Sequence, residues 1–374
     1  RDLRMSRGLG DVYKRQKMSR YIIDKSKLIE NINIIKNKAG VEVIGVVKGN
    51  GYGFGMCSLA EILMQNEINT FAVTEVYDIP LLRETVIDRD ILVMRSTSIE
   101  EEAKIIAEND CIATIGSLSA AEVMDKVSKK LNKKTKCHLK IDTGMGRYGF
   151  LPSEVEKAIK CYDFENLDFC GAYTHFSSAF HNAELTKVQL EMFKDTIEQI
   201  KKAGKNVGIL HAANSPALLN VDGVTLDAVR IGSAFTGRVI TRGKNPLNKL
   251  GELQAEVIET KTVPKGYSIG YNGQYKTKRE TKIAIVPIGH FDGFGLQKGK
   301  ESADFHSVLS QLKHYLQKEQ LTVNVNGKKY NVIGEIGLSH TAIDITDSDV
   351  KIGDVASVEI SPLMVNPNVP RIYK

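Results

Sequence analysis

A lysine at the end of an apolar run opens a glycine-rich turn. The run VEVIGVV covers residues 41–47, and Lys48 follows it as the first residue of KGNGYGFG. An ammonium group beside a buried strand is costly unless it is paired or takes part in a reaction. Glycines let a backbone approach a ligand closely, and such turns after strands often bind phosphate. Lys48 is therefore a candidate functional residue beside a phosphate, although a salt-bridged lysine before an ordinary tight turn fits the same pattern.

Other polar residues stand at or just past the ends of similar apolar runs along the chain. They are Arg95, Asp142, Thr174, His175, His211 and Arg230. In a barrel of parallel strands, side chains at the carboxyl ends of the strands usually form the active site. The sequence therefore places these residues with Lys48 among the candidates for chemistry.

The elements that must position these residues alternate along the chain. Short runs rich in β-branched residues recur at 41–47, 70–73, 91–94, 111–115, 137–141, 169–173, 208–212 and 228–231. Segments with helical periodicity separate most of them, including 58–66, 99–109, 117–131 and 183–202. This alternation predicts a parallel sheet in an α/β fold, and eight strands are the number that closes a (β/α)8 TIM-type barrel. An open doubly wound sheet is the alternative, but no G-x-G-x-x-G follows the first run to favour it.

The pattern changes after about residue 243. Runs at 253–263, 281–289, 321–337, 341–346 and 354–360 are short and alternate in polarity, with turn signals between them. One helical stretch is expected near 302–318. We expect a non-native or disordered leader over 1–17, with Met18 as the natural start, because that segment has no periodicity. The barrel is then expected over 18–243 and a mostly β C-terminal domain over 244–374.

Composition excludes several classes of protein. Of 374 residues, 42% are hydrophobic and 26% are charged, so the chain can bury a core and is not generally disordered. No run approaches ~18 consecutive apolar residues, and no secretory signal is recognisable. The net charge of +6 includes +3 from residues 1–16, and the remainder gives no case for nucleic acid or membrane as a partner. Five cysteines without a C-x-x-C pair favour free thiols in the cytoplasm and no metal site.

Seven segments together resemble one known family. In chain order they are VVKGNGYGFG, KIDTGMGRYGF, YTHFSSA, HAANSPALL, VRIGSAFTG, SIGYNGQY and VPIGHFDGF. Their order and spacing are similar to those of the alanine racemases, which are fold-type III pyridoxal-phosphate enzymes. The resemblance extends from about residue 19 to residue 373. The family combines a (β/α)8 barrel with a β-domain, in agreement with the architecture that the periodicity predicts.

The resemblance implies pyridoxal 5′-phosphate as the cofactor. Its expected ligands are Lys48, Tyr52, His175, Ser215, Arg230, Gly232 and Ser233. Lys48 is implied to carry the cofactor covalently, and Arg230 to face the pyridine nitrogen. A permanent cation at that nitrogen disfavours a protonated ring and limits side reactions. His211 is implied to support Arg230.

The resemblance also implies a small amino-acid substrate and a homodimer. Lys48 and Tyr271 are the expected catalytic residues, with Tyr271 supplied by the second subunit and supported by His175. Arg147 and the backbone of Leu338 are expected to bind the substrate carboxylate. Lys140 stands where some members of the family carry a carbamylated lysine; an unmodified strand lysine is the alternative.

Two bases suit this chemistry because racemisation removes a proton from one face of a planar carbon and returns one to the other. Free lysine and tyrosine have pKa values near 10, so both pKa values must be lowered towards neutrality by burial or by nearby cations. The resemblance implies that Lys48 serves the D-enantiomer and Tyr271 the L-enantiomer.

Five departures from the family's usual residues bear on the substrate, and Phe54, in place of a histidine, is a lesser one. Gly337, Leu338 and Ser339 stand where cysteine, methionine and aspartate are usual, and Pro367 and His290 replace two tyrosines at the substrate entrance. These departures leave the cofactor chemistry intact but weaken the expected preference for a small substrate. We expect an isomerase, an alanine racemase that supplies D-alanine for peptidoglycan. A racemase of serine or of a larger or basic amino acid, and a non-catalytic pyridoxal-phosphate-binding protein, are the alternatives.

Overall fold

The chain divides into two compact units. The computed structural model describes residues 19–273, 275–296 and 320–374. One unit is Lys25–Leu250, and the other is Gly251–Lys374 together with residues 19–24. The expected leader over 1–17 and the helical stretch expected near 302–318 lie outside the described residues.

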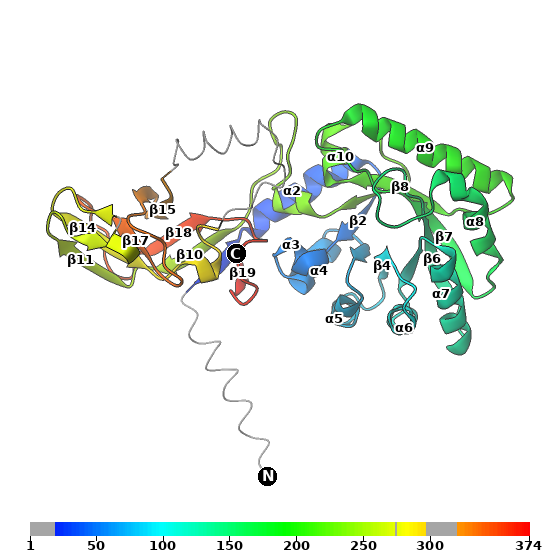
Figure 1. The fold of residues 1–374 in the computed structure, drawn as a ribbon, viewed down its shortest axis with the longest axis horizontal. Helices are drawn as coiled ribbons and strands as arrows, with labels where there is room; N and C mark the ends of the chain where they lie inside the picture. Colours follow the sequence, from blue (N-terminus) through cyan, green and yellow to red (C-terminus); the bar gives the residue numbers. More distant parts are fainter. Residues whose placement is uncertain (1–18, 274, 297–319) are drawn as a thin grey trace, which may run out of the picture. The chain divides into compact units, whose positions relative to one another are not determined.

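The unit Lys25–Leu250 is a closed barrel of eight parallel strands (Figure 1). The strands are β2 (Glu42–Val46), β3 (Thr70–Val73), β4 (Asp90–Ser96), β5 (Ile112–Ile115), β6 (Thr135–Lys140), β7 (Leu167–Tyr173), β8 (Ile209–Asn214) and β9 (Ala228–Ile231). Each strand pairs with the next, and β2 also pairs with β9, which closes the barrel. The eight predicted runs and the barrel are confirmed.

Helices connect the barrel strands, as the periodicity predicts. They are α2 (Lys25–Ala39), α3 (Lys48–Tyr52), α4 (Met56–Gln65), α5 (Ile79–Thr85), α6 (Glu100–Glu108), α7 (Leu118–Lys130), α8 (Val155–Lys160), α9 (Ala183–Lys202) and α10 (Ser215–Asn220). Polar side chains cap the start of two of the longest: Ser117 accepts from the Ala120 N–H, and Asn182 accepts from the Leu185 N–H. No helix among the described residues has the length and apolar character needed to span a membrane.

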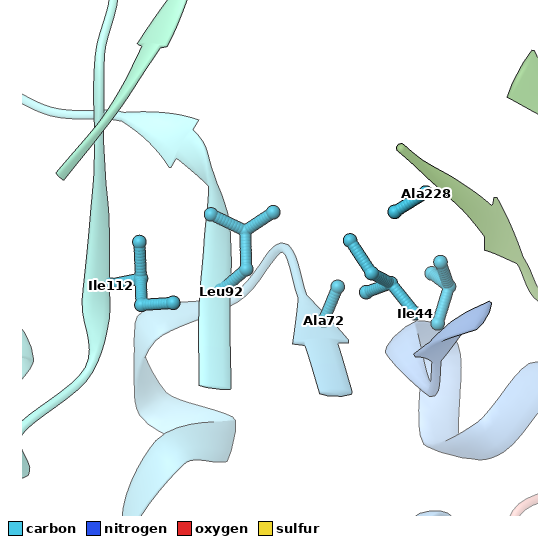
Figure 2. Packing of buried hydrophobic residues seen from close by; sticks show 6 residues of the cluster. Ile44, Ala72, Leu92, Ile112 and Ala228 are labelled. Carbon is cyan, nitrogen blue, oxygen red and sulfur yellow. The ribbon is translucent and has the colours of Figure 1, made fainter. Parts of the chain in front are cut away.

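Part of the barrel interior is apolar. Ile44, Ala72, Leu92, Ile112 and Ala228 come from five strands and pack in one buried cluster (Figure 2). In a closed barrel, side chains from strands as far apart as β5 and β9 can share one cluster only inside the barrel. This packing makes the barrel a filled scaffold rather than a pore, so its strand ends are held in fixed positions.

The second unit is mostly β-structure. A six-stranded sheet has the order β16-β15-β18-β10-β1-β19, and a three-stranded sheet has the order β11-β14-β17. The strands of these sheets are β1 (Arg20–Ile23), β10 (Glu252–Glu256), β11 (Glu259–Val263), β14 (Thr281–Val286), β15 (Thr322–Val325), β16 (Lys328–Asn331), β17 (Thr341–Asp344), β18 (Val355–Glu359) and β19 (Arg371–Tyr373). A short hairpin joins β12 (Ser268–Ile269) to β13 (Tyr275–Lys276). The mostly β second domain is confirmed.

The boundaries of the two units differ from the expected limits of 18–243 and 244–374, because the strand β1 belongs to the β unit. This strand pairs antiparallel with β10 and parallel with β19, so residues 20–23 belong to the β unit although they precede the barrel in sequence. At the other end, residues 244–250 remain with the barrel, where the Arg238 side chain donates to the Leu250 carbonyl.

Candidate active site

Lys48 stands directly beyond the carboxyl end of β2, at the start of a left-handed turn. Gly49, Asn50, Gly51 and Tyr52 have φ values of 59°, 53°, 63° and 53°. A left-handed residue other than glycine costs roughly 1–2 kcal/mol, so glycine at two of these four positions reduces the strain. The Asn50 side chain accepts from the Met56 N–H at 2.9 Å and ties the turn to α4. The glycine-rich motif therefore forms a compact, left-handed turn beside Lys48.

The barrel interior is polar on the strands β6 to β9. His138 and Lys140 on β6, Tyr173 on β7, His211 on β8 and Arg230 on β9 are all buried. The Lys140 Nζ lies 4.4 Å from the centre of the Tyr173 ring, and the Arg230 guanidinium carbon lies 4.9 Å from it. The ring of Tyr173 also stacks on His211, with ring centres 4.8 Å apart. These contacts bring the strand-end residues together at the carboxyl end of the barrel.

Arg230 is held from several sides. Its Nη2 donates to the backbone carbonyls of Thr174 at 2.7 Å and Ala212 at 3.0 Å, and its Nη1 lies 2.7 Å from the Nδ1 of His211. The Nδ1 of His175 lies 3.3 Å from Nη2. Burial lowers the pKa of Arg230 to about 10, so it stays cationic at neutral pH. The support of Arg230 by His211 that the sequence predicts agrees with this geometry.

Arg147 lies on a loop that the Asp142 carboxylate holds by its backbone. Oδ1 of Asp142 accepts from the N–H groups of Gly144, Met145 and Gly146, and Oδ2 accepts from the N–H of Arg147 at 3.0 Å. Burial by itself raises the pKa of Asp142, but the four backbone donors outweigh it and lower that pKa from 3.8. Asp142 is therefore an ionised clamp for the loop.

Gln189 of α9 joins this loop to the loop that follows β7. Its Nε2 donates to the Thr143 carbonyl at 3.0 Å, and its Oε1 accepts from the N–H of Ser177 at 3.1 Å. Gln189 is buried, and the hydroxyls of Thr143 and Thr174 also form a hydrogen bond of 2.8 Å between the two loops. The loops that carry Arg147 and His175 are thus fixed to each other.

Positive charge accumulates at this end of the barrel. Burial, with the nearby cations Arg147 and Arg230, lowers the pKa of Lys48. Burial and the same two arginines lower the pKa of Lys140 to about 7, against an opposing effect of Asp142. His175 is affected similarly: burial and then the four basic side chains lower its pKa. The site therefore favours neutral amines and a neutral imidazole and keeps its permanent charge on the arginines.

A second part of the site presents hydrogen-bond donors where two helices begin. Ser215 is the first residue of α10, and its Oγ accepts from the N–H groups of Gly232 at 3.2 Å and Ala234 at 3.3 Å. Ser233 is the first residue of a 3-10 helix, η4 (Ser233–Thr236), and its N–H donates to none of the described residues. Tyr52 packs against Gly232 so closely that a Cβ there would lie 2.3 Å from the Tyr52 ring. Helix starts of this kind bind phosphate groups.

These donors and cations fit pyridoxal phosphate. Lys48, Lys140, Arg147 and Arg230 influence one another electrostatically, and the carboxylate of Asp142 among them already accepts four backbone hydrogen bonds. An anionic ligand is needed to balance this charge. Burial raises the pKa of Tyr52 to about 12, so its phenol stays protonated and can donate to a phosphate. Among the described residues, no group of acidic, cysteine and histidine side chains could hold a metal ion.

Tyr271 and Leu338 lie together in the β unit. Both line a groove with a volume of about 450 Å³, and both are about two-thirds exposed, at 67% and 65%. The Leu338 carbonyl accepts from the Phe291 N–H at 2.8 Å, while the N–H of Leu338 donates to none of the described residues. Leu338 therefore keeps the free backbone donor that its expected role requires.

The family follows from comparison with known proteins. The model of the alanine racemase N-terminal domain matches residues 23–239, and that of the C-terminal domain matches residues 250–362. The chain belongs to the alanine racemase family. An alanine racemase of Methanococcus maripaludis is 32% identical over 348 residues, which cover 90% of this chain and 87% of that protein.

Solved structures agree with this assignment. The structure of an alanine racemase from Clostridium difficile 630 matches with a TM-score of 0.79 and 27% identity, over 91% of this chain and 86% of that one. A histidine racemase from Leuconostoc mesenteroides has the same fold, with a TM-score of 0.80 at 18% identity, over 96% of this chain and 97% of that one. Alanine racemases are isomerases. The family that the sequence resembles and the predicted enzyme class are therefore both confirmed.

The structure collects the predicted residues into two groups. The barrel brings together Lys48, Tyr52, Arg147, His175, His211, Ser215, Arg230, Gly232 and Ser233, and the β unit brings together Tyr271 and Leu338. Sequence reasoning missed His138 and Gln189. His138 had a signal, because the β6 segment CHLK alternates polar and apolar residues although the strand is buried. Gln189 had none, since its partners are distant in sequence.

Proposed function

We propose that this protein is a pyridoxal-phosphate-dependent racemase that interconverts L-alanine and D-alanine. The observation that carries the proposal is the cationic cluster around Lys48, whose pKa burial and two arginines lower. A lysine whose pKa is lowered carries more free amine than an unperturbed lysine, and the free amine can act both as a nucleophile and as a base. The rest of the constellation matches the demands of an anionic cofactor and a carboxylate substrate.

The cofactor is held at its two ends in this proposal. Lys48 would hold it covalently, and Arg230, with His175 beside it, would face its ring nitrogen. Its phosphate is bound by the donors of Tyr52, Ser215, Gly232 and Ser233. When bound, pyridoxal phosphate withdraws electrons from the substrate's α-carbon and so makes the α-proton acidic.

Two side chains of the protein move the α-proton. The Lys48 amine takes or returns it on one face, for the D-enantiomer, and the Tyr271 phenol does so on the other, for the L-enantiomer. Arg147 binds the substrate carboxylate, and the free N–H of Leu338 donates to the same carboxylate. By resemblance to the family, Tyr271 is supplied by the partner in a homodimer. We further propose that the enzyme works in the cytoplasm and supplies D-alanine for peptidoglycan.

A wider substrate range is the second candidate. His290 and Pro367 replace two tyrosines of the family, and the His290 Nδ1 lies 2.9 Å from the carbonyl of Phe294 in its own loop. Neither residue can supply a phenol at the substrate entrance. Because an added methylene changes binding by only about 1–3 kcal/mol, modest changes in this shape admit serine or longer side chains.

Deuterium exchange tests the two-base proposal. Lys48→Ala should abolish turnover in both directions. Tyr271→Phe keeps the ring but removes the phenol, so it should stop racemisation while the α-proton of D-alanine still exchanges with solvent. Equal exchange of both enantiomers by Tyr271→Phe would show that a single base or water does the work.

A racemisation screen over the common amino acids separates the substrate alternatives. Turnover of alanine with serine and longer residues slower by more than about a thousandfold would exclude the wider range. Comparable turnover of a larger residue would support it. Binding of pyridoxal phosphate without turnover of any enantiomer would leave the protein as a cofactor-binding protein.

A further inference from the structure

Three buried side chains form a line across the barrel interior. The Nδ1 of His138 on β6 lies 2.9 Å from the Nε2 of His211 on β8, and the Nδ1 of His211 lies 2.7 Å from the Nη1 of Arg230 on β9. All three residues are at most 3% exposed. The line starts at Arg230, the residue proposed to face the cofactor ring, and ends at His138.

The chemistry of arginine sets the direction of every hydrogen bond in this line. A guanidinium has only donors, so the Nδ1 of His211 must accept from Arg230 and carry no proton. Burial, together with the cation Arg230, lowers the pKa of His211 well below its usual value, so its ring is neutral. The single proton of His211 is therefore on Nε2 and is donated to the Nδ1 of His138.

The surroundings keep His138 in the position that accepts this proton. Residue 171 is glycine, and a Cβ there would lie 2.4 Å from the Nε2 of His138. Burial lowers the pKa of His138 to about 4, so its ring is neutral, and its proton is on Nε2 because Nδ1 accepts. A fixed, neutral acceptor thus stands behind His211.

We propose that His138 is a positioning residue for Arg230: by accepting the Nε2 proton of His211, it holds the His211 ring with its free Nδ1 lone pair towards the guanidinium. This inference rests on the proposed function, in which Arg230 faces the cofactor ring. Hydrogen bonds in such a chain strengthen one another, so loss of the last acceptor weakens the first bond as well. Without His138, the His211 Nε2–H loses its buried hydrogen-bond acceptor, and the ring of His211 rotates towards another acceptor.

Two variants separate this role from simple packing. His138→Asn keeps an acceptor near the position of Nδ1, whereas His138→Leu has almost the same volume and no polar atom. In the first measurement, histidine labelled with ¹⁵N is observed in the protein without added cofactor. The expected result is a His211 that carries its proton on Nε2 in the unmodified protein and in His138→Asn, and an altered His211 signal in His138→Leu.

The second measurement uses the protein with pyridoxal phosphate. In the proposed function, the Arg230 cation disfavours a protonated cofactor ring and so limits side reactions such as transamination. Loss of a buried hydrogen bond changes an equilibrium or rate ratio by about tenfold. We therefore expect His138→Leu to raise the rate of transamination relative to racemisation by about tenfold. His138→Asn should restore most of the original ratio. Each ratio is formed from two rates of the same protein sample, so a smaller amount of folded protein does not change it.

The two measurements fail separately. A His211 protonated on Nδ1 in the unmodified protein would overturn the proposal whatever the activity, and so would identical His211 signals in the Leu and Asn variants. If His138→Leu does not fold, the unmodified protein and His138→Asn still decide the tautomer. An unchanged tautomer pattern with no racemisation of any amino acid would refute the proposed function instead.

Discussion

Asp142→Asn should loosen the loop that carries Arg147. The carboxylate accepts four backbone N–H groups, three at Oδ1 within 2.7–3.2 Å and one, from Arg147, at Oδ2. An asparagine keeps one carbonyl oxygen, which can serve the three donors, and places an NH2 group against the Arg147 N–H. One hydrogen bond to a charged group is lost, at about 1.5–3 kcal/mol.

The expected result is a lower melting temperature and weaker substrate binding. A loss of about 2 kcal/mol in a unit of this size lowers the melting temperature by about 4–8 °C. Because Arg147 binds the carboxylate in the proposed function, KM should rise more than kcat falls. Thermal unfolding followed by circular dichroism and steady-state kinetics measure the two effects.

The pH dependence gives an independent check on the cause. The backbone donors hold the pKa of folded Asp142 below 3.8, so its contribution to stability is complete above that pH and disappears as the pH falls through the lower folded value. The difference between the unmodified protein and Asp142→Asn should therefore be constant near neutral pH and narrow in acid. Asp168→Asn is the matched control, because Asp168 is exposed on β7. Equal melting temperatures of the two variants would refute the role assigned to Asp142.

Three further predictions concern the site. Mixing inactive Lys48→Ala and Tyr271→Ala proteins should restore part of the activity, because each hybrid dimer contains one site with both groups. No recovery of activity after confirmed subunit exchange would contradict the supply of Tyr271 by the partner. Lys140 should take up carbon dioxide as a carbamate in bicarbonate buffer, since burial and two arginines lower its pKa to about 7 and leave a reactive neutral amine. The absence of a ¹³C carbamate signal in protein equilibrated with ¹³C-labelled bicarbonate would exclude it. Gln189→Glu should weaken substrate binding several-fold at nearly unchanged cofactor affinity, because a carboxylate cannot donate to the Thr143 carbonyl; equal losses of both affinities would point to general unfolding.

The barrel could be predicted because its strands are buried on both faces. Runs such as 43–47 and 91–94 are continuously apolar, and this pattern requires only local composition. The short strands β12 and β13 have two residues each and leave no such run. The strand β1 was missed because its partners are strands more than 200 residues away.

The site was predictable where a motif marks a residue and unpredictable where only distance does. Lys48 follows a strand closely and Arg230 is the penultimate residue of one, so their place in a barrel follows from their place in the sequence. The clamp formed by Asp142 depends on the path of the following loop, and the bridge formed by Gln189 joins two loops through a helix. Such roles arise from packing, which no local pattern in the chain records.

The position of β1 determines the order in which the protein can fold during synthesis. Residues 20–23 are translated before the barrel, but one of their partners, β19 at 371–373, is translated after it. At 5–20 residues per second, β1 waits roughly 15–70 s for that partner. The barrel is translated in the meantime and can fold on its own contacts, while the apolar Tyr21, Ile22 and Ile23 have no partner strand. Until its partner strands are made, β1 is an unpaired strand that other nascent chains can contact.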